Sequence, residues 1–232
     1  AMIAYNLESE IYSITGLQAF LKIAQHHNIW HYPIHLKLDT GMHRLGFEPH
    51  LIDELCSLLK NNNFVKVKSV FSHLAASDDL ELDDFTKLQF QRFDAMYSEL
   101  EKVLPSKPIR HILNTSGIFN YAEKQMEMVR LGIGLYGIGN SEQELKVLEN
   151  VSTLKTIISQ IREVSIEESI GYSRKFRVTQ KMKVATIPIG YADGIRRAWG
   201  NEKGFVTINN QKATILGSIC MDMMMVDVTN IS

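Results

Sequence analysis

Four short polar segments follow apolar, strand-like stretches of the sequence and contain the side chains best suited to chemistry. They are residues 39–44 (Asp-Thr-Gly-Met-His-Arg), 72–73 (Ser-His), 114–117 (Asn-Thr-Ser-Gly) and 130–134 (Arg-Leu-Gly-Ile-Gly). Arginine and histidine can bind an anion, and glycines let backbone N–H groups approach it. The segments therefore predict a phosphate site at the last two strand ends, with Arg44, His73 and Arg130 nearby.

Each segment also has a simpler interpretation. The tetrapeptide at 114–117 is commonly a turn that begins a helix, and His73 is as readily a core histidine with satisfied hydrogen bonds. Arg44 or Arg130 alone is often an ordinary salt-bridge partner. Their joint placement at strand ends is what favours a functional site.

A glycine pattern near residue 132 matches the fingerprint of dinucleotide-binding proteins. Gly132, Gly134 and Gly137 have the required spacing. No amphipathic helix opens after them and no complete βαβ unit follows. We reject this interpretation.

The elements that must position these segments alternate between strands and helices. We expect about five strands before residue 140, among them residues 34–38, 65–71, 109–113 and 126–129, with helices between them, including those near 17–24, 49–59 and 83–100. This alternation indicates parallel βα units. Five strands are too few to close an eight-stranded barrel. The predicted fold class is therefore α/β, an incomplete TIM (β/α)8 barrel followed by a partial all-β C-terminal domain.

The pattern of residue types along the sequence changes after Gly139. A polar, helix-like stretch at 142–148 suits a linker, and β-rich segments follow at 154–161, 183–189, 205–208 and 213–217. Asn209 and Asn210 are a typical hairpin turn. We expect two domains, residues 1–140 and 141–232, with the second cut off before a clear end.

Composition excludes several classes of function. The 232 residues contain 25 Lys and Arg against 26 Asp and Glu, which is not the basic balance of a nucleic-acid-binding protein. No apolar run is long enough for a membrane span, and the start is not a signal peptide. Two cysteines make neither a disulfide framework nor a zinc set. We expect a reduced, cytoplasmic setting with no metal, membrane or nucleic-acid partner.

Seven blocks, in order along the chain, resemble the alanine racemase family. They are residues 36–46 (LKLDTGMHRLG), 71–75 (FSHLA), 111–117 (HILNTSG), 129–137 (VRLGIGLYG), 170–173 (IGYS), 187–194 (IPIGYADG) and 217–222 (GSICMD). One block alone would be modest support, but the ordered set covers almost the whole chain. The resemblance implies a pyridoxal 5′-phosphate barrel, a C-terminal β-domain and a head-to-tail homodimer.

The resemblance also implies which residues hold the cofactor. Asn114 and the Thr115 hydroxyl match positions near the cofactor phosphate, with backbone N–H groups from Gly132 and Ile133. Arg130 matches the arginine that faces the pyridine nitrogen. Because an arginine keeps its proton, the ring nitrogen stays unprotonated and withdraws electrons more weakly, which limits side reactions.

Catalytic roles follow from the same resemblance. Tyr172 matches the catalytic tyrosine that enters from the partner subunit, and His73 and Arg130 are the neighbours that would lower its pKa. Arg44 matches a catalytic residue that contacts the substrate carboxylate. Lys37 matches a lysine that is often carbamylated and braces that arginine.

Three further residues complete the expected substrate pocket. Tyr191, Met221 and Asp222 match its other side, also contributed across the dimer. Two departures from the common family pattern, Leu131 for proline and Thr115 for serine, look tolerable, because the phosphate needs only a hydroxyl and backbone donors.

The serious departure is the cofactor lysine. The family carries it on the first barrel strand in a Val-Lys-Ala-Asn-Ala-Tyr-Gly-like block, and no such block occurs among these residues. Racemisation needs a base on each face of the substrate carbanion, and only the tyrosine is present. We expect the chain to be a fragment that is inactive or nearly so alone, with open barrel edges that promote association.

The implied function is pyridoxal-phosphate-dependent interconversion of L- and D-alanine, an isomerase reaction that supplies D-alanine for peptidoglycan. A broader amino-acid racemase remains open, since pocket width cannot be read from the residues. An ornithine-decarboxylase-like enzyme is disfavoured by Tyr172 and the block at 220–222, and a non-catalytic pyridoxal-phosphate-binding barrel by the β-rich second domain. Excision from a fusion with a cell-wall ligase is a further alternative.

Overall fold

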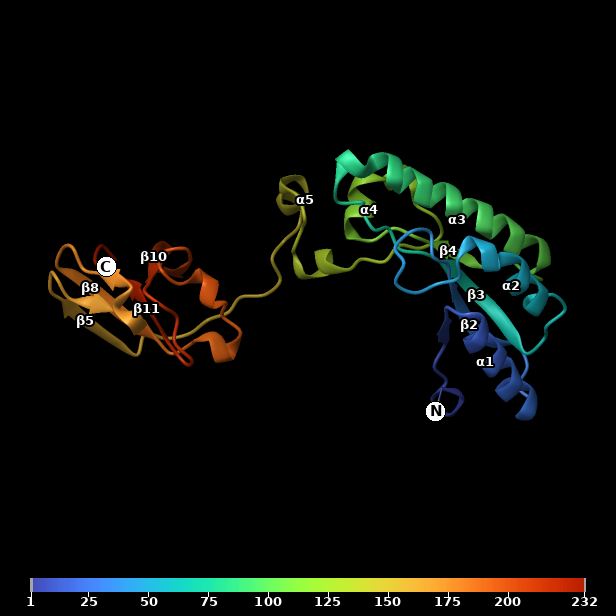
Figure 1. Cartoon of the computed structure of the whole chain (residues 1–232), viewed down its shortest axis with the longest axis horizontal. Coiled ribbons are helices and arrows are strands. Elements are labelled where there is room, and N and C mark those ends of the chain that lie inside the picture. Colours follow the sequence, from blue (N-terminus) through green and yellow to red (C-terminus); the bar gives the residue numbers. More distant parts are fainter. Residues whose placement is uncertain (1, 232) are drawn as a thin grey trace. The chain divides into compact units, whose positions relative to one another are not determined.

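The computed structural model describes residues 2–231 and divides into two units, residues 1–152 and 153–232. The first unit is built from βα repeats and the second from antiparallel strands (Figure 1). The family of fold expected from the sequence is thus confirmed for each unit. The helix α5 (Glu142–Val147), which we expected to be a linker, belongs to the first unit.

The first unit contains one parallel sheet. Its strands are paired in the order β1-β2-β3-β4, and the chain alternates them with helices: β1 (Ser9–Ile11), α1 (Ile14–His26), β2 (Tyr32–Lys37), α2 (Ile52–Leu59), β3 (Val65–Phe71), α3 (Asp83–Val103), β4 (Ile109–His111) and α4 (Thr115–Asn120). Residues that favour helix starts precede two of these helices. Ser13 caps α1 by accepting a hydrogen bond from the N–H of Gly16, and Pro49 opens the turn before α2.

The two faces of this sheet differ in polarity. Strand residues such as Ile34, Leu36 and Val70 are fully buried in one core with apolar residues of α1, α2 and α3. The alternate strand positions carry the polar face, which we define as Glu8, Glu10, His35, Lys37, Ser69, Phe71 and His111. Parallel sheets are usually apolar on both faces. A polar face therefore indicates a surface built for binding.

A β-bulge in β3 sets which residues join the polar face. Ile34 pairs with Val67 and the next residue, His35, pairs with Ser69, so Lys68 is an extra, unpaired residue. Without an extra residue, successive side chains alternate between faces; with it, Lys68 and Ser69 follow one another on the polar side. Ser69 thereby comes to lie beside His35.

One expected strand of this unit is absent from the described residues. Residues 126–129 were predicted as a fifth strand, but four strands form and this segment is irregular. It still runs along β4, since the N–H groups of Met128 and Arg130 donate to the carbonyls of Arg110 and Leu113. These two hydrogen bonds align the segment with the sheet without forming a regular strand pairing. They also place Arg130 beside the sheet.

The second unit is a five-stranded antiparallel sheet in the order β5-β8-β11-β10-β9, with a two-stranded ribbon. The strands are β5 (Gln160–Val164), β8 (Met182–Ile187), β9 (Phe205–Ile208), β10 (Gln211–Leu216) and β11 (Met224–Asp227), and the ribbon is β6 (Ser169–Ile170) with β7 (Phe176–Arg177). Asn209 and Asn210 form the predicted two-residue turn, with φ of 47° and 61°. The strand expected at 154–161 begins only at Gln160.

A glycine shapes the loop that follows β2. Gly46 has φ of +133°, and a Cβ there would lie 2.6 Å from the backbone nitrogen of Asp39. We expect Gly46→Ala to reduce the free energy of unfolding by about 1–3 kcal/mol, because the strained backbone and the clash must be relieved together. Urea unfolding measures this loss. Leu45→Ala, at an exposed neighbour, is the matched control and should change stability by less than about 0.5 kcal/mol.

Candidate active site

The polar face lines an open hollow of about 400 Å³, together with Arg44, His73, Met128 and Arg130. Three of the residues predicted from strand ends (Arg44, His73 and Arg130) therefore meet in one place, with Lys37 among them. The hollow covers one face of the parallel sheet and includes Lys37, Phe71 and His111, the last residues of β2, β3 and β4. Ligands bind at such carboxyl ends in βα architectures.

Arg130 is the central cation of this site. Its guanidinium donates to the carbonyl of Ser72 at 2.6 Å, to Nδ1 of His73 at 3.2 Å and to Nδ1 of His111. It also lies 4.9 Å from the ring centre of Phe71. Burial lowers the pKa of Arg130, which still remains a cation. Among the described residues its hydrogen-bond partners are all neutral, and a partly buried cation without a bound carboxylate is typical of a functional site.

The environment around Arg130 keeps the rings of His73 and His111 neutral. Burial and the charge of Arg130 lower the pKa of each ring to about 4, and Arg44 and Lys37 add to the effect at His73. Because Arg130 can only donate, Nδ1 of each ring must accept, which leaves the ring proton on Nε2. His73 can thus present an Nε2–H group to a ligand in the hollow.

This arrangement predicts acid sensitivity. Between pH 6.5 and about 4 the unfolded chain binds protons at both histidines and the folded chain does not, so stability is complete above pH 6.5 and falls as the pH drops toward 4. We expect a loss of about 2–3 kcal/mol for each ring. Urea unfolding at a series of pH values, with NMR titration of the rings, measures it. A stability that stays flat from pH 6.5 to 4.5 would contradict the assignment.

The loop that carries Arg44 is fixed by a carboxylate. Oδ1 of Asp39 accepts from the N–H groups of Gly41, Met42 and His43 at 2.8, 3.0 and 3.1 Å. Sequence reasoning missed a second brace, Gln89. This fully buried amide donates to Thr40 and to the carbonyl of His73 and accepts from the N–H of Ala75. The sequence did contain a sign of this role, because Gln89 is a polar residue at a position of α3 where the helical spacing predicts a core-facing apolar residue.

Lys37 has a carboxylate partner. Its Nζ lies 3.3 Å from Glu10 Oε1 and 5.6 Å from the ring centre of Phe71, and its side chain is 12% exposed. Glu10 was not singled out from the sequence. Carbamylation of Lys37 stays a prediction, which ¹³C NMR in labelled bicarbonate tests directly.

The segments expected to bind phosphate are brought together at the end of β4. Asn114 caps α4 through Oδ1, which accepts from the N–H of Gly117 at 2.9 Å. Oγ1 of the buried Thr115 accepts from the N–H groups of Gly132 and Gly134, both at 3.1 Å. Ile133 is the first residue of a 3-10 turn, so its N–H has no intrahelical partner. Beside them, a Cβ on Gly132 would meet only Thr115 Oγ1, at 3.6 Å, which leaves an open cradle.

The second unit holds the other predicted residues near one end of its sheet. The N–H groups of Tyr191 and Ala192 donate to the carbonyls of Cys220 and Met221, both at 3.0 Å. This joins the loop of Tyr191 to the loop of Met221 and Asp222.

Glycine contacts bring the tyrosine loop to the same place. Gly171 has φ of +79°, and a Cβ there would lie 3.2 Å from the nitrogen of Ser218. Tyr172, next in sequence, is 70% exposed and therefore accessible to a ligand or a partner.

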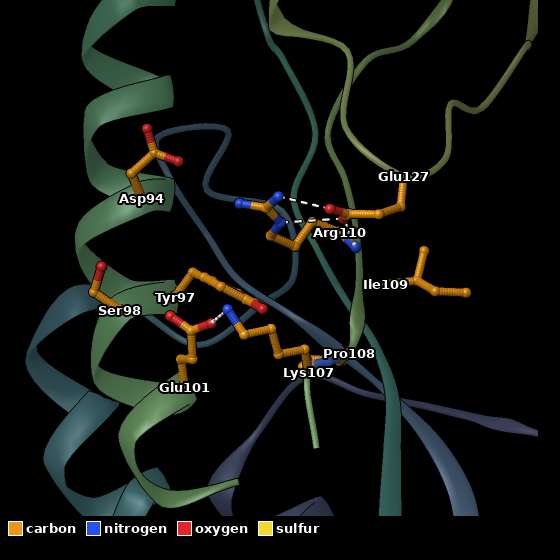
Figure 2. Close-up of a pocket in the computed structure, with 9 residues that line it drawn as sticks. All are labelled: Asp94, Tyr97, Ser98, Glu101, Lys107, Pro108, Ile109, Arg110 and Glu127. Carbon is orange, nitrogen blue, oxygen red and sulfur yellow. Dashed lines mark hydrogen bonds and ion pairs between the residues drawn. The ribbon is translucent and has the colours of Figure 1, made fainter. Parts of the chain in front are cut away.

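A larger hollow of about 530 Å³ lies elsewhere on the first unit. Figure 2 shows that it is lined by the second half of α3 and by the segment entering β4, with Arg110 paired to Glu127 and Lys107 to Glu101. It is at the amino end of β4, the face that βα folds use for stability rather than catalysis. We assign it no chemistry.

The remaining expectations concern metals and membranes. Within residues 2–231, no group of three or more His, Cys, Asp or Glu side chains is arranged to hold a metal ion. None of the helices in that range is long and apolar enough to cross a membrane.

Fold and site together define a two-domain chain, a βα unit with a cationic site at its strand ends and a separate antiparallel β unit. The pattern of the alanine racemase N-terminal domain matches residues 1–140, and that of the alanine racemase C-terminal domain matches residues 151–232. The chain belongs to the alanine racemase family.

Individual relatives agree. The chain is 36% identical to an alanine racemase of Clostridium tetani over 98% of its own length and 59% of the relative, and 33% identical to one of Methanococcus maripaludis over 99% and 62%. It thus spans about 60% of the length of these relatives.

Solved structures match as well. The alanine racemase of Bartonella henselae with covalently bound pyridoxal phosphate has a TM-score of 0.84 at 26% identity, over 100% of this chain and 62% of that one. An alanine racemase of Clostridium difficile also has a TM-score of 0.84, at 30% identity over 100% and 60%. The family and fold expected from the sequence are confirmed.

Proposed function

We propose that these residues form the greater part of an alanine racemase that uses pyridoxal 5′-phosphate. The observation that carries the proposal is the junction at the end of β4, where Thr115 holds the Gly132–Gly134 turn beside the partly buried cation Arg130. Family membership and the pyridoxal phosphate in the Bartonella henselae relative support it. The same family relationship supports a cytoplasmic homodimer that provides D-alanine for peptidoglycan.

The residues present fit the phosphate and ring of this cofactor. The open space beside Gly132 and the N–H of Ile133 suit a phosphate group, and the Thr115 hydroxyl can donate its proton to a phosphate oxygen. The guanidinium of Arg130, held among neutral acceptors, can donate to an unprotonated ring nitrogen. When bound, the cofactor supplies a conjugated ring that stabilises negative charge at the substrate Cα.

The other side chains act on the substrate. Arg44 offers a bidentate partner to the amino-acid carboxylate. The phenol oxygen of Tyr172 takes or returns the Cα proton on one face, and in a head-to-tail dimer it would come from the partner. His73, kept neutral, can donate to that oxygen from Nε2. Tyr191, Met221 and Asp222 would close the substrate side.

Racemisation is tested with the protein expressed from its complete gene, supplied with pyridoxal phosphate and either alanine enantiomer. We expect conversion in both directions, and Tyr172→Phe should lower kcat by about 10²–10⁴-fold, because the phenol proton is lost. Tyr5→Phe, at a tyrosine 75% exposed and outside the site, is the matched control. Full activity in Tyr172→Phe, or preference for serine over alanine, would contradict the proposal.

A further inference from the structure

A continuous row of hydrogen bonds crosses the polar face of the sheet beneath Arg130. Nδ1 of His111 contacts Arg130, and its Nε2 lies 3.1 Å from Ser69 Oγ. Ser69 Oγ lies 2.6 Å from Nδ1 of His35, whose Nε2 lies 2.8 Å from Glu8 Oε2. One residue comes from each of β2, β3 and β4, and Glu8 immediately precedes β1.

The direction of every bond in this row is set by chemistry. Arg130 has no acceptor, so Nδ1 of the neutral His111 accepts and its Nε2–H must donate to Ser69 Oγ. The Ser69 hydroxyl has one proton, and within residues 2–231 its only hydrogen-bond partners are the two rings, so it donates to Nδ1 of a neutral His35 ring. The proton of His35 is then on Nε2 and points at Glu8.

The far end of the row is a fixed acceptor. Glu8 Oε1 accepts from Lys68 Nζ at 2.7 Å, and Lys68 and His35 together lower the pKa of the Glu8 carboxyl. An ionised carboxylate can only accept. The row therefore begins at a group that can only donate and ends at one that can only accept.

We propose that Glu8, His35 and Ser69 are positioning residues for Arg130, acting through the tautomer of His111. If the row were broken, His111 could carry its proton on Nδ1 and face Arg130 donor to donor, which would displace the guanidinium from its place beside Ser72 and His73. The bulge at Lys68 supports this role, because it supplies both the serine of the row and the lysine that anchors its end.

The relevance of this row to cofactor binding depends on the function proposed above, but the row itself can be tested without cofactor. In the 232-residue chain with ¹⁵N-labelled histidine, we expect both His35 and His111 as Nε2–H tautomers with unprotonated Nδ1. Ser69→Ala should turn His111 into a tautomer mixture and speed solvent exchange of the Arg130 side-chain N–H groups about tenfold, the factor for one lost hydrogen bond. Ser69→Thr, which keeps the hydroxyl, should restore both signals.

A second variant, Glu8→Ala, tests the proposal if Ser69→Ala does not fold. Glu8 precedes the strand and its side chain is 35% exposed, so Glu8→Ala should fold and should shift His35, then His111, in the same direction with a smaller effect. Unchanged ring nitrogen shifts and unchanged Arg130 exchange in a folded Glu8→Ala or Ser69→Ala chain would overturn the proposal. Altered tautomers in these variants together with normal alanine racemisation would retain the row and reject its role. The expected tautomers in the unsubstituted chain, together with no racemisation by the protein from its complete gene, would reject only the proposed function.

Discussion

Replacing Thr115 by valine is expected to weaken pyridoxal phosphate binding by about 100-fold while the chain stays folded. Valine matches the shape of threonine but lacks Oγ1, which accepts from both Gly132 and Gly134. Two N–H groups would lose their acceptor, at about 1–3 kcal/mol each, and the turn facing the phosphate would loosen. A cofactor titration followed by absorbance, on the protein from its complete gene, measures the dissociation constant.

Thr115→Ser is the matched comparison for this effect. It retains the hydroxyl and removes only the methyl group. That methyl group packs closely against Gly134, since a Cβ added to Gly134 would lie 2.6 Å from it. We expect affinity much closer to the starting protein than to Thr115→Val. A larger loss in Thr115→Ser than in Thr115→Val would mean that the methyl packing, and not the hydroxyl, holds the turn.

Replacing Arg130 by methionine is expected to lower kcat by about 10²–10³-fold. The guanidinium is the only group in the described residues that donates to His73, His111 and the Ser72 carbonyl together. Its loss also removes the second-largest cause of the low pKa of both rings, so each pKa should rise from about 4, with burial still holding it below 6.5.

The ring titrations make this prediction independent of turnover. NMR of the 232-residue chain should show both histidines titrating at higher pH in Arg130→Met, and Arg130→Lys should give smaller shifts because it keeps the charge but not the planar fork. Rings that titrate unchanged in Arg130→Met would show that burial alone sets their pKa, and would remove Arg130 from the centre of the site.

The sequence predicted the parts of the first unit that depend on local pattern. Alternating apolar residues located β2 and β3, and polar residues after them located Arg44 and His73. The fifth strand at 126–129 was wrong, because a single backbone hydrogen bond, from Met128 to Arg110, joins this segment to β4, and the next, from Arg130 to Leu113, lies beyond both. We predicted that helix α5 lies outside the first unit because most of its residues are polar. Its buried residue Glu144 accepts a hydrogen bond from the N–H of Asn140, and the sequence gives no sign of this contact.

The polar face could not be predicted in the same way. Polar residues that alternate with apolar ones along a strand normally indicate a solvated face, so Glu8, Glu10, His35 and Ser69 gave no functional signal. Their meaning arises only when three parallel pairings place them side by side. The bulge at Lys68 is equally hidden, since one extra residue in a seven-residue strand leaves no mark on composition.

The bulge has a consequence for insertions and deletions. In an ordinary strand, losing one residue sends every later side chain to the opposite face. In β3, removal of Lys68 leaves Val67, Ser69, Val70 and Phe71 in regular alternation, each still directed as it is now. A related gene could therefore be one codon shorter at this point and keep the apolar core and Ser69 in place, losing only the lysine that donates to Glu8. The corresponding deletion in the regular strand β2 would send His35 or Lys37 into the core, so β3 is the strand of this pair whose length can vary.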